Sequence, residues 1–371
     1  MTPLPISPSM PMRPRPSVPL RPEAAPHPPP SADEDRWRWR RLSSAPHRIA
    51  FFAGGVLVAL SALWWLAALG TRHAGVALTW AVPPPLAHGL VMTLAFNPLF
   101  MVGFLYTAGP RWLGLPDTPG ATLVRPVAAL AVAWAVAGVG LHLHTGLAAA
   151  GVALAAVVWT ALTVRFARLV AASRVADRLH ARAVAAAAVV GALTTAAAAV
   201  ALAQGEMAWL RAATALAMWG FVAPVFAIVS HRMLPFFTQG ALPMLHAWRP
   251  PAVLAWMLVA LGATGIGAAA EALHGTLPTA AHAALLALQA PTAALLLWLA
   301  LRWGLVQSLS VKLLAMLHGG FVWLGLAFAL AAASQVMALW QIGPGGLGLA
   351  PLHALTLGFL GATLLAMITR V

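Results

Sequence analysis

The chain has 371 residues, of which 61% are hydrophobic and 8% are charged, and its formal net charge is +14. Soluble domains carry about 25% charged residues, so the composition excludes a soluble fold, and the apolar content excludes disorder over most of the chain. The basic residues are spread thinly between apolar runs, which argues against a nucleic-acid-binding protein. The composition predicts an all-α, polytopic transmembrane helix bundle.

Two residue types limit the possible chemistry further. The chain has no cysteine, which excludes disulfides, iron–sulfur clusters, thiolate-ligated haem and cysteine nucleophiles. Four of the eight acidic residues precede the first apolar run, and the other four, Asp117, Asp177, Glu206 and Glu271, fall in predicted loops or at helix ends. Transport of protons or cations along buried carboxylates is therefore unsupported. Any bound metal must use histidine, methionine, main-chain or oxygen ligands.

Residues 1–48 are predicted to form a separate, disordered cytoplasmic tail. Twelve of the first 36 residues are proline, and this composition gives an extended chain without a core. Residues 36–41 then alternate arginine with tryptophan, which suits the lipid headgroup interface, with a partner-binding motif as the alternative. The first apolar run begins only near Ile49, so this region is not a signal peptide.

Residues 49–371 are predicted to form the transmembrane domain. They contain ten apolar segments, each close to the roughly 20 residues that span a bilayer. Proline-rich and glycine-rich breakers separate these segments. We place them at 49–70, 86–106, 124–143, 147–166, 183–203, 210–230, 252–270, 279–300, 312–334 and 350–369.

The distribution of basic residues predicts the orientation. With the N-terminus in the cytoplasm, the inner loops carry twelve basic residues and the outer loops carry two, Arg72 and Arg211. This is the positive-inside pattern, and one missed or invented helix would scramble it. The inner residues are Arg111, Arg125, Arg165, Arg168, Arg174, Arg178, Arg182, Arg232, Arg249, Arg302, Lys312 and Arg370.

Histidines are the remaining candidate ligands, and the layout gives each one a depth at about 1.5 Å per residue. His88, His282 and His353 lie near outer helix ends, whereas His318 and His231 lie near inner ends. Because a metal–imidazole bond is about 2 Å long, His318, roughly 15 Å away along the membrane normal, cannot easily share one metal atom with His88. The sequence thus allows an outer site of His88 and His353, with His282 as an additional candidate, and an inner site of His318 with His231.

The competing interpretation is that a histidine near a helix end is an interfacial or hydrogen-bonded residue. We expect this for His27, His47, His142, His144, His180, His246, His274 and His282. His318 differs, because a polar ring inside a helix of leucine, alanine and phenylalanine needs a partner.

Other features bear on how the helices pack. Asn97-Pro98 predicts a helix kink that frees backbone carbonyls. The kink would either line a cavity or serve only the packing of the helices. The pairs Gly358 with Gly361 and Gly262 with Gly265 predict close contacts between helices.

Four motifs, in order from about residue 86 to the end, resemble the NnrS family. The first begins at His88 and ends in Gly103-Phe104, Thr107-Ala108, Pro110 and Trp112. The second is the segment from His231 to Thr238, and the third is Leu317-His318 with Trp323. The fourth runs from Leu352-His353 through Gly358 and Gly361 to Val371.

The resemblance implies a multi-pass protein of the bacterial inner membrane that is linked to the nitric oxide response and contains haem and copper. It implies His88, His318 and His353 as cofactor ligands, and His231 joins them as a metal candidate. The family's second histidine and following glutamate fall on Leu90 and Val91 here. Family members usually continue with a Gly-His-x-Gly-Arg run and about two more helices, so we expect this chain to be truncated and to lack a ligand histidine.

The leading hypothesis is a haem- and copper-binding membrane protein in the response and resistance to nitric oxide and nitrosative stress. Its expected partners are membrane lipid, nitric oxide or a related small molecule, and a respiratory-chain or redox protein. Two alternatives remain: a transporter or permease for a small neutral or anionic solute, and a factor delivering haem or copper to respiratory enzymes. No catalytic motif is visible, so enzyme activity stays open.

Overall fold

A computed structural model describes residues 39–245, 248–343 and 346–369, and every regular element in these ranges is helical. The elements are η1 (Trp39–Ser44), α1 (Pro46–His73), α2 (Pro84–Leu94), α3 (Asn97–Trp112), η2 (Gly120–Leu123), α4 (Val124–Leu143), α5 (Thr145–Ala172), α6 (Leu179–Gln204), α7 (Met207–Ala217), η3 (Met218–Val222), α8 (Ala223–Ala241), α9 (Pro251–His274), α10 (Thr279–Arg302), α11 (Leu305–Ser308), α12 (Lys312–Leu339), α13 (Ala350–His353), η4 (Ala354–Gly361) and α14 (Ala362–Ile368).

Ten helical stretches in the described residues are long and apolar enough to cross a membrane. Each overlaps one of the ten predicted segments, which confirms the predicted all-α, polytopic fold. The largest difference is the sixth stretch, Met207–Ala241, which is 35 residues long where the sequence predicts 210–230. Hydropathy falls at His231 and Arg232, but the helical hydrogen bonding continues to Ala241.

The predicted tail falls mostly outside the described residues, which begin at Trp39. The described part of residues 39–48 forms η1 and the start of α1. Pro46 occupies the first position of α1, where its missing N–H costs no helical hydrogen bond.

The second stretch is interrupted at Asn97-Pro98, as the sequence predicts. The helix stops at Leu94 and restarts at Asn97, so the main-chain carbonyls of Met92 and Thr93 lose their usual helical partners. The Asn97 side-chain amide donates hydrogen bonds to both carbonyls, at 3.0 and 3.3 Å. Two of the carbonyls at the interruption are therefore paired by a side chain of the same stretch.

The sixth stretch changes helix type midway. Between α7 and α8 lies η3, one turn of π-helix, and Pro224 follows it at the start of α8. A proline cannot donate the usual i→i−4 hydrogen bond, and a π-turn is one way in which a helix accommodates that loss.

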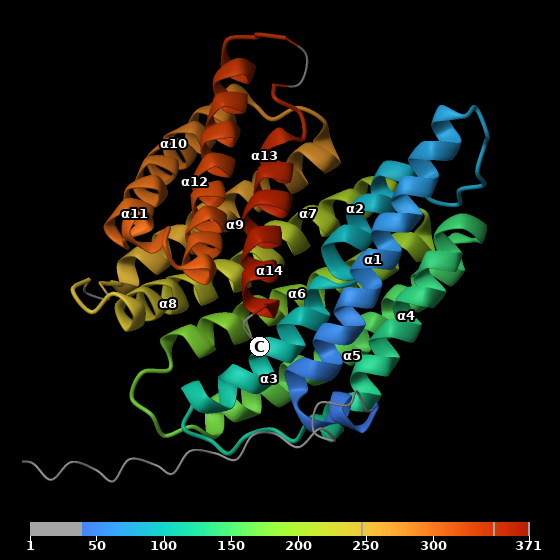
Figure 1. Ribbon diagram of the computed structural model, residues 1–371. Helices are drawn as coiled ribbons and strands as arrows, with labels where there is room; N and C mark the ends of the chain where they lie inside the picture. The colour runs from blue at the N-terminus through green and yellow to red at the C-terminus, as the bar shows by residue number, and fades with distance from the viewer. Residues whose placement is uncertain (1–38, 246–247, 344–345, 370–371) are drawn as a thin grey trace, which may run out of the picture. The chain divides into compact units, whose positions relative to one another are not determined.

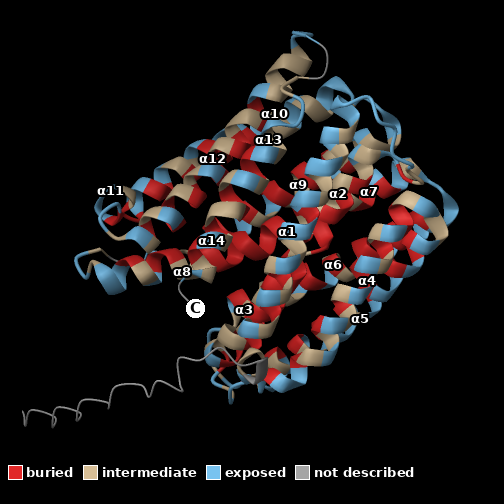
Figure 2. Ribbon diagram, turned by 45° about the vertical axis from the view of Figure 1, so that its right-hand side comes forward, coloured by how far each residue is buried: buried red, intermediate tan, exposed pale blue. Residues whose placement is uncertain are grey.

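The second and sixth stretches are the most enclosed. In each, 78% of the most apolar window is buried inside the protein, against 17% for α1. Elements α7 and α8 contact α6 on one side and α9 on the other, and α8 also contacts α12 and η4. In Figure 1 this stretch runs between α1–α6 and the orange and red helices α10–α14. Figure 2 shows buried residues concentrated along α7, α8 and the helix faces turned toward them.

Candidate functional site

Two of the buried histidines contact each other where α8 meets α6. His231 is fully buried and His180 is 4% exposed. His180 Nε2 and His231 Nδ1 lie 3.0 Å apart, and the two rings are stacked. Each ring keeps one buried nitrogen, His231 Nε2 and His180 Nδ1, without a hydrogen-bond partner. Because the Pro250 main chain also lies close enough to interact with the His231 ring, His180 Nδ1 is the more open of these two nitrogens to a ligand or a metal.

Cationic and aromatic side chains surround this pair. The Trp303 ring meets the His231 ring edge-on, with centroids 5.9 Å apart. The Arg232 guanidinium lies 4.9 Å from the centre of the Trp112 ring and 3.6 Å from a carboxylate oxygen of Asp177. Arg232 and Arg249 both act on His180 electrostatically and Asp177 opposes them more weakly, so a divalent cation at this pair would face net repulsion.

His318 belongs to the neighbouring helix α12. It faces α8 at Thr238, two helical turns beyond His231. It is fully buried, and its Nε2 lies 3.0 Å from the Thr238 hydroxyl. Its Nδ1 has no hydrogen-bond partner. Thr238 thus supplies the partner that the sequence requires for this ring, and one buried nitrogen remains free.

The four motif segments contact one another in a continuous line. Trp112 of the first contacts Arg232 of the second, and Thr238 of the second contacts His318 of the third. Trp323 of the third lies against Gly358 of the fourth so closely that a Cβ on this glycine would collide with the indole. Residues up to 246 positions apart in the sequence thus form one chain of contacts that connects α3, α8, α12 and η4.

The outer candidates, His88 and His353, are more exposed than the inner ones. The His88 ring is partly buried and stacks on Trp65 at a centroid distance of 4.0 Å. His88 Nδ1 is buried without a hydrogen-bond partner. His353 is exposed and near enough to act on His88 electrostatically. Its Nδ1 lies 3.0 Å from the Leu349 carbonyl, and an imidazole held in this way presents its Nε2 lone pair to a metal.

Several other histidines have structural partners. His142 accepts from the Trp64 indole at 2.8 Å, and its other nitrogen lies 2.8 Å from the Thr79 carbonyl. His144 caps the start of α5 through the Gly146 N–H. His282 lies 2.7 Å from the Gln335 side-chain oxygen. His246 and His27 fall outside the described residues.

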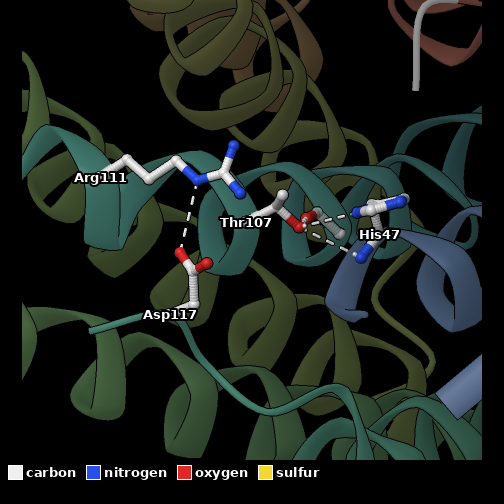
Figure 3. Close-up of polar contacts among 5 residues, drawn as sticks. His47, Thr107, Arg111 and Asp117 are labelled. Carbon is white, nitrogen blue, oxygen red and sulfur yellow. Dashed lines mark hydrogen bonds and ion pairs between the residues drawn. The ribbon is translucent and has the colours of Figure 1, made fainter. Parts of the chain in front are cut away.

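Figure 3 shows two polar contacts at the end of α3, where the first motif ends. The Thr107 hydroxyl accepts from the main-chain N–H of His47 at 3.2 Å and lies 3.3 Å from His47 Nδ1. Arg111 pairs with Asp117 at 3.4 Å on the surface. Thr107 therefore joins the start of α1 to α3, which is a structural role for a motif residue.

No group of three or more histidine, cysteine, aspartate or glutamate side chains with metal-site geometry occurs in the described part of the chain. The arrangement thus offers single imidazoles or pairs. Sequence reasoning did not select His180, because it places this residue in the basic inner loop. The structure places His180 at the second position of α6 and buries it, and only the packing of α6 on α8 brings it to His231.

Comparison with known proteins decides the family. A family model described as NnrS protein matches residues 41–371. The chain belongs to the NnrS family. No curated protein and no solved structure matches it significantly. The match covers every described span, so the contacts between the four motifs connect the segments by which the sequence resembles other NnrS proteins. Leu90 and Val91, where the resemblance implies histidine and glutamate, are both buried in the apolar core.

Proposed function

We propose that this NnrS protein binds haem, with copper as a second metal, in a bacterial inner membrane and acts in the response and resistance to nitric oxide. Family membership supports the link to nitric oxide. The observation that carries the cofactor proposal is a set of buried imidazole nitrogens without partners, on His88, His231 and His318. A buried polar atom without a partner costs free energy, and coordination to a metal would remove that cost.

The donor set fits haem better than a closed metal site. Haem iron needs only one or two axial protein ligands, whereas structural zinc sites use four and catalytic zinc sites use three. The described residues offer imidazoles singly or in pairs. His318 would hold haem at one site through its unpaired nitrogen, and His88 with His353 would hold it at another. When bound, haem supplies the iron to which nitric oxide coordinates.

Copper fits the pair of His231 and His180. Imidazole is a suitable copper ligand, and copper bound between His180 Nε2 and His231 Nδ1 would replace the hydrogen bond that now joins these two adjacent nitrogens. Because Arg232 and Arg249 act on His180 electrostatically, the pair would hold monovalent copper in preference to a divalent ion.

An apolar cavity would admit a small neutral molecule from the bilayer. It has a volume of about 50 Å³ and lies between α1, α3, α8 and α14. Its wall contains Thr363, whose hydroxyl lies so near Gly320, two residues after His318, that a Cβ on this glycine would collide with it. A neutral diatomic gas needs no charged entry path, so this cavity suits a route toward His318.

The experiment is an optical spectrum of the purified protein, oxidised and reduced, with and without nitric oxide, together with haem and copper analysis. His88→Ala, His318→Ala, His353→Ala and His231→Ala are each compared with His274→Ala, which removes an exposed imidazole at the end of α9. We expect a Soret band that shifts with nitric oxide, retained in the control and lost in at least one of the four variants. A protein without haem or copper, or full retention in all four variants, would contradict the proposal.

The same measurement separates the alternatives. Substoichiometric, exchangeable metal would favour a delivery factor. A colourless protein that takes up solute in vesicles would favour a transporter. The structure gives the transporter little support at Asn97-Pro98, because Asn97 itself pairs the carbonyls of Met92 and Thr93.

A further inference from the structure

A groove runs between α4 and α5 on the outside of the bundle, near the arginine-rich ends of these helices. Its volume is about 400 Å³, and nearly all of its wall is apolar. Two arginines, Arg125 and Arg165, are its only charged lining residues. The remaining lining residues are Pro126, Ala129, Val157, Val158, Ala161 and Leu162.

The sequence of the two helices explains the groove. Near the turn that joins them, Gly140 and Gly151 let the backbones touch, since a Cβ at either position would overlap the backbone of the other helix. Toward the other end, Ala129 and Ala161 fill little space, which leaves a hollow between the helices. Val157 is 67% exposed, so its side chain faces outward into the surrounding medium.

The two arginines at the groove have no carboxylate partner. Arg125 makes no ion pair or hydrogen bond to any described residue, and Arg165 donates to the Thr122 hydroxyl at 2.9 Å. The Arg165 guanidinium also lies 5.2 Å from the centre of the Tyr106 ring. The nearest described acids along the chain, Asp117 and Asp177, pair with other arginines. Two positive charges therefore remain available to an anion.

The groove also lies at the right depth for a lipid. Helix α5 has 28 residues and is about 42 Å long, whereas the hydrocarbon core is about 30 Å thick. Counted from Thr145, a core of about 30 Å takes up about 20 residues and ends near Arg165, which lies seven residues before the end of α5 and so reaches the level of the headgroups. Val157 lies about 12 Å deeper, among the acyl chains.

We propose that this groove binds one anionic phospholipid. Its phosphate would lie between Arg125 and Arg165, and one acyl chain would lie along Ala129, Val157 and Ala161. The charge selects an anionic headgroup, and the apolar wall selects a molecule that carries a chain. A soluble anion would use the two arginines alone and gain nothing from the wall.

The test is native mass spectrometry of the full chain, released from nanodiscs that contain phosphatidylglycerol, phosphatidylcholine or both with matched acyl chains. We expect one retained phosphatidylglycerol. The double variant Arg125→Gln, Arg165→Gln should weaken its binding about 30-fold, or about fivefold for each arginine. The control Arg182→Gln, Arg302→Gln removes two exposed arginines from the same side of the protein and should change binding less than twofold.

A second variant tests the wall without changing charge. Ala161→Leu fills the groove and should displace the lipid, whereas Ala197→Leu, at an exposed position of α6, should not. Equal retention of phosphatidylcholine, full competition by inorganic phosphate at the same concentration, or unchanged binding in the double variant would overturn the proposal.

Discussion

The Thr107 hydroxyl connects the beginning of α1 to α3. It accepts from the His47 N–H, which belongs to the first turn of a helix that has no side-chain cap of its own. Thr107→Val keeps the shape and removes the acceptor, so we expect a loss of about 1 kcal/mol in stability, as for a lost N-cap. Thermal unfolding in detergent measures it. The control is Thr160→Val, whose exposed hydroxyl bonds only within its own helix. Equal shifts in both variants would contradict this role.

For single residues, the sequence predicts how deep each histidine lies along its helix. It does not predict which residue of a neighbouring helix each histidine ring contacts. The depths group His88 with His353, and in the structure His353 is within electrostatic range of His88. The depths also group His318 with His231, but the hydrogen-bonding partners of these rings are Thr238 and His180. Which residue faces a buried ring depends on the azimuth of each helix in the bundle, and hydropathy carries no information about that azimuth where both faces are apolar.

At the scale of the element, Asn97 compensates for the break that Pro98 makes in the second stretch. Asn97→Leu would leave the buried carbonyls of Met92 and Thr93 without a partner, at a cost of about 1–3 kcal/mol. Combining it with Pro98→Ala lets the helix close again, so the double variant should be more stable than Asn97→Leu alone. Chemical unfolding of both variants measures the difference. Simple additivity of the two substitutions would show that Asn97 does not serve the break.

The packing of η4 on α12 gives a matched pair of glycine substitutions. A Cβ on Gly358 would collide with the Trp323 ring, whereas a Cβ on Gly361 would meet its nearest neighbour, the Thr356 carbonyl, at 3.5 Å. Gly358→Ala should therefore cost about 1–3 kcal/mol, and Gly361→Ala should be neutral or slightly stabilising. Thermal unfolding of both variants decides it. Equal destabilisation in both variants would contradict the assignment of the cost to the contact with Trp323, because alanine is the better helix former at either position.

The glycines also show what a sequence pattern leaves open. The sequence predicts close packing at both members of each pair, but only Gly358 and Gly265 touch another helix, while Gly262 has open space beside it. A spacing of three places two glycines on one helical face without saying which of them a bulky neighbour covers. Here the neighbours are tryptophans, Trp323 and Trp219, from helices distant in the sequence.

For the molecule as a whole, the ten spans could be predicted because each needs an uninterrupted apolar run. Their order in space could not. The two most enclosed stretches, Pro84–Trp112 and Met207–Ala241, are no more apolar than the rest, with mean hydropathies of 1.6 and 2.0 against 2.1 for the peripheral α1. In a membrane, lipid and protein interior are equally apolar, so burial leaves no hydropathy difference and helix contacts depend on small residues and polar pairs.

The orientation of the whole bundle remains a prediction, and the absence of cysteine makes it directly testable. Ala176 and Thr276 are exposed in loops at opposite ends of the spans, after α5 and after α9. Because the loop at Ala176 is rich in arginine, the positive-inside pattern places it in the cytoplasm. A membrane-impermeant maleimide should therefore label Thr276→Cys in intact cells, and Ala176→Cys only after permeabilisation. The cysteine-free parent is the control for background. The reverse pattern would invert the orientation, and it would also put the two groove arginines at the outer leaflet.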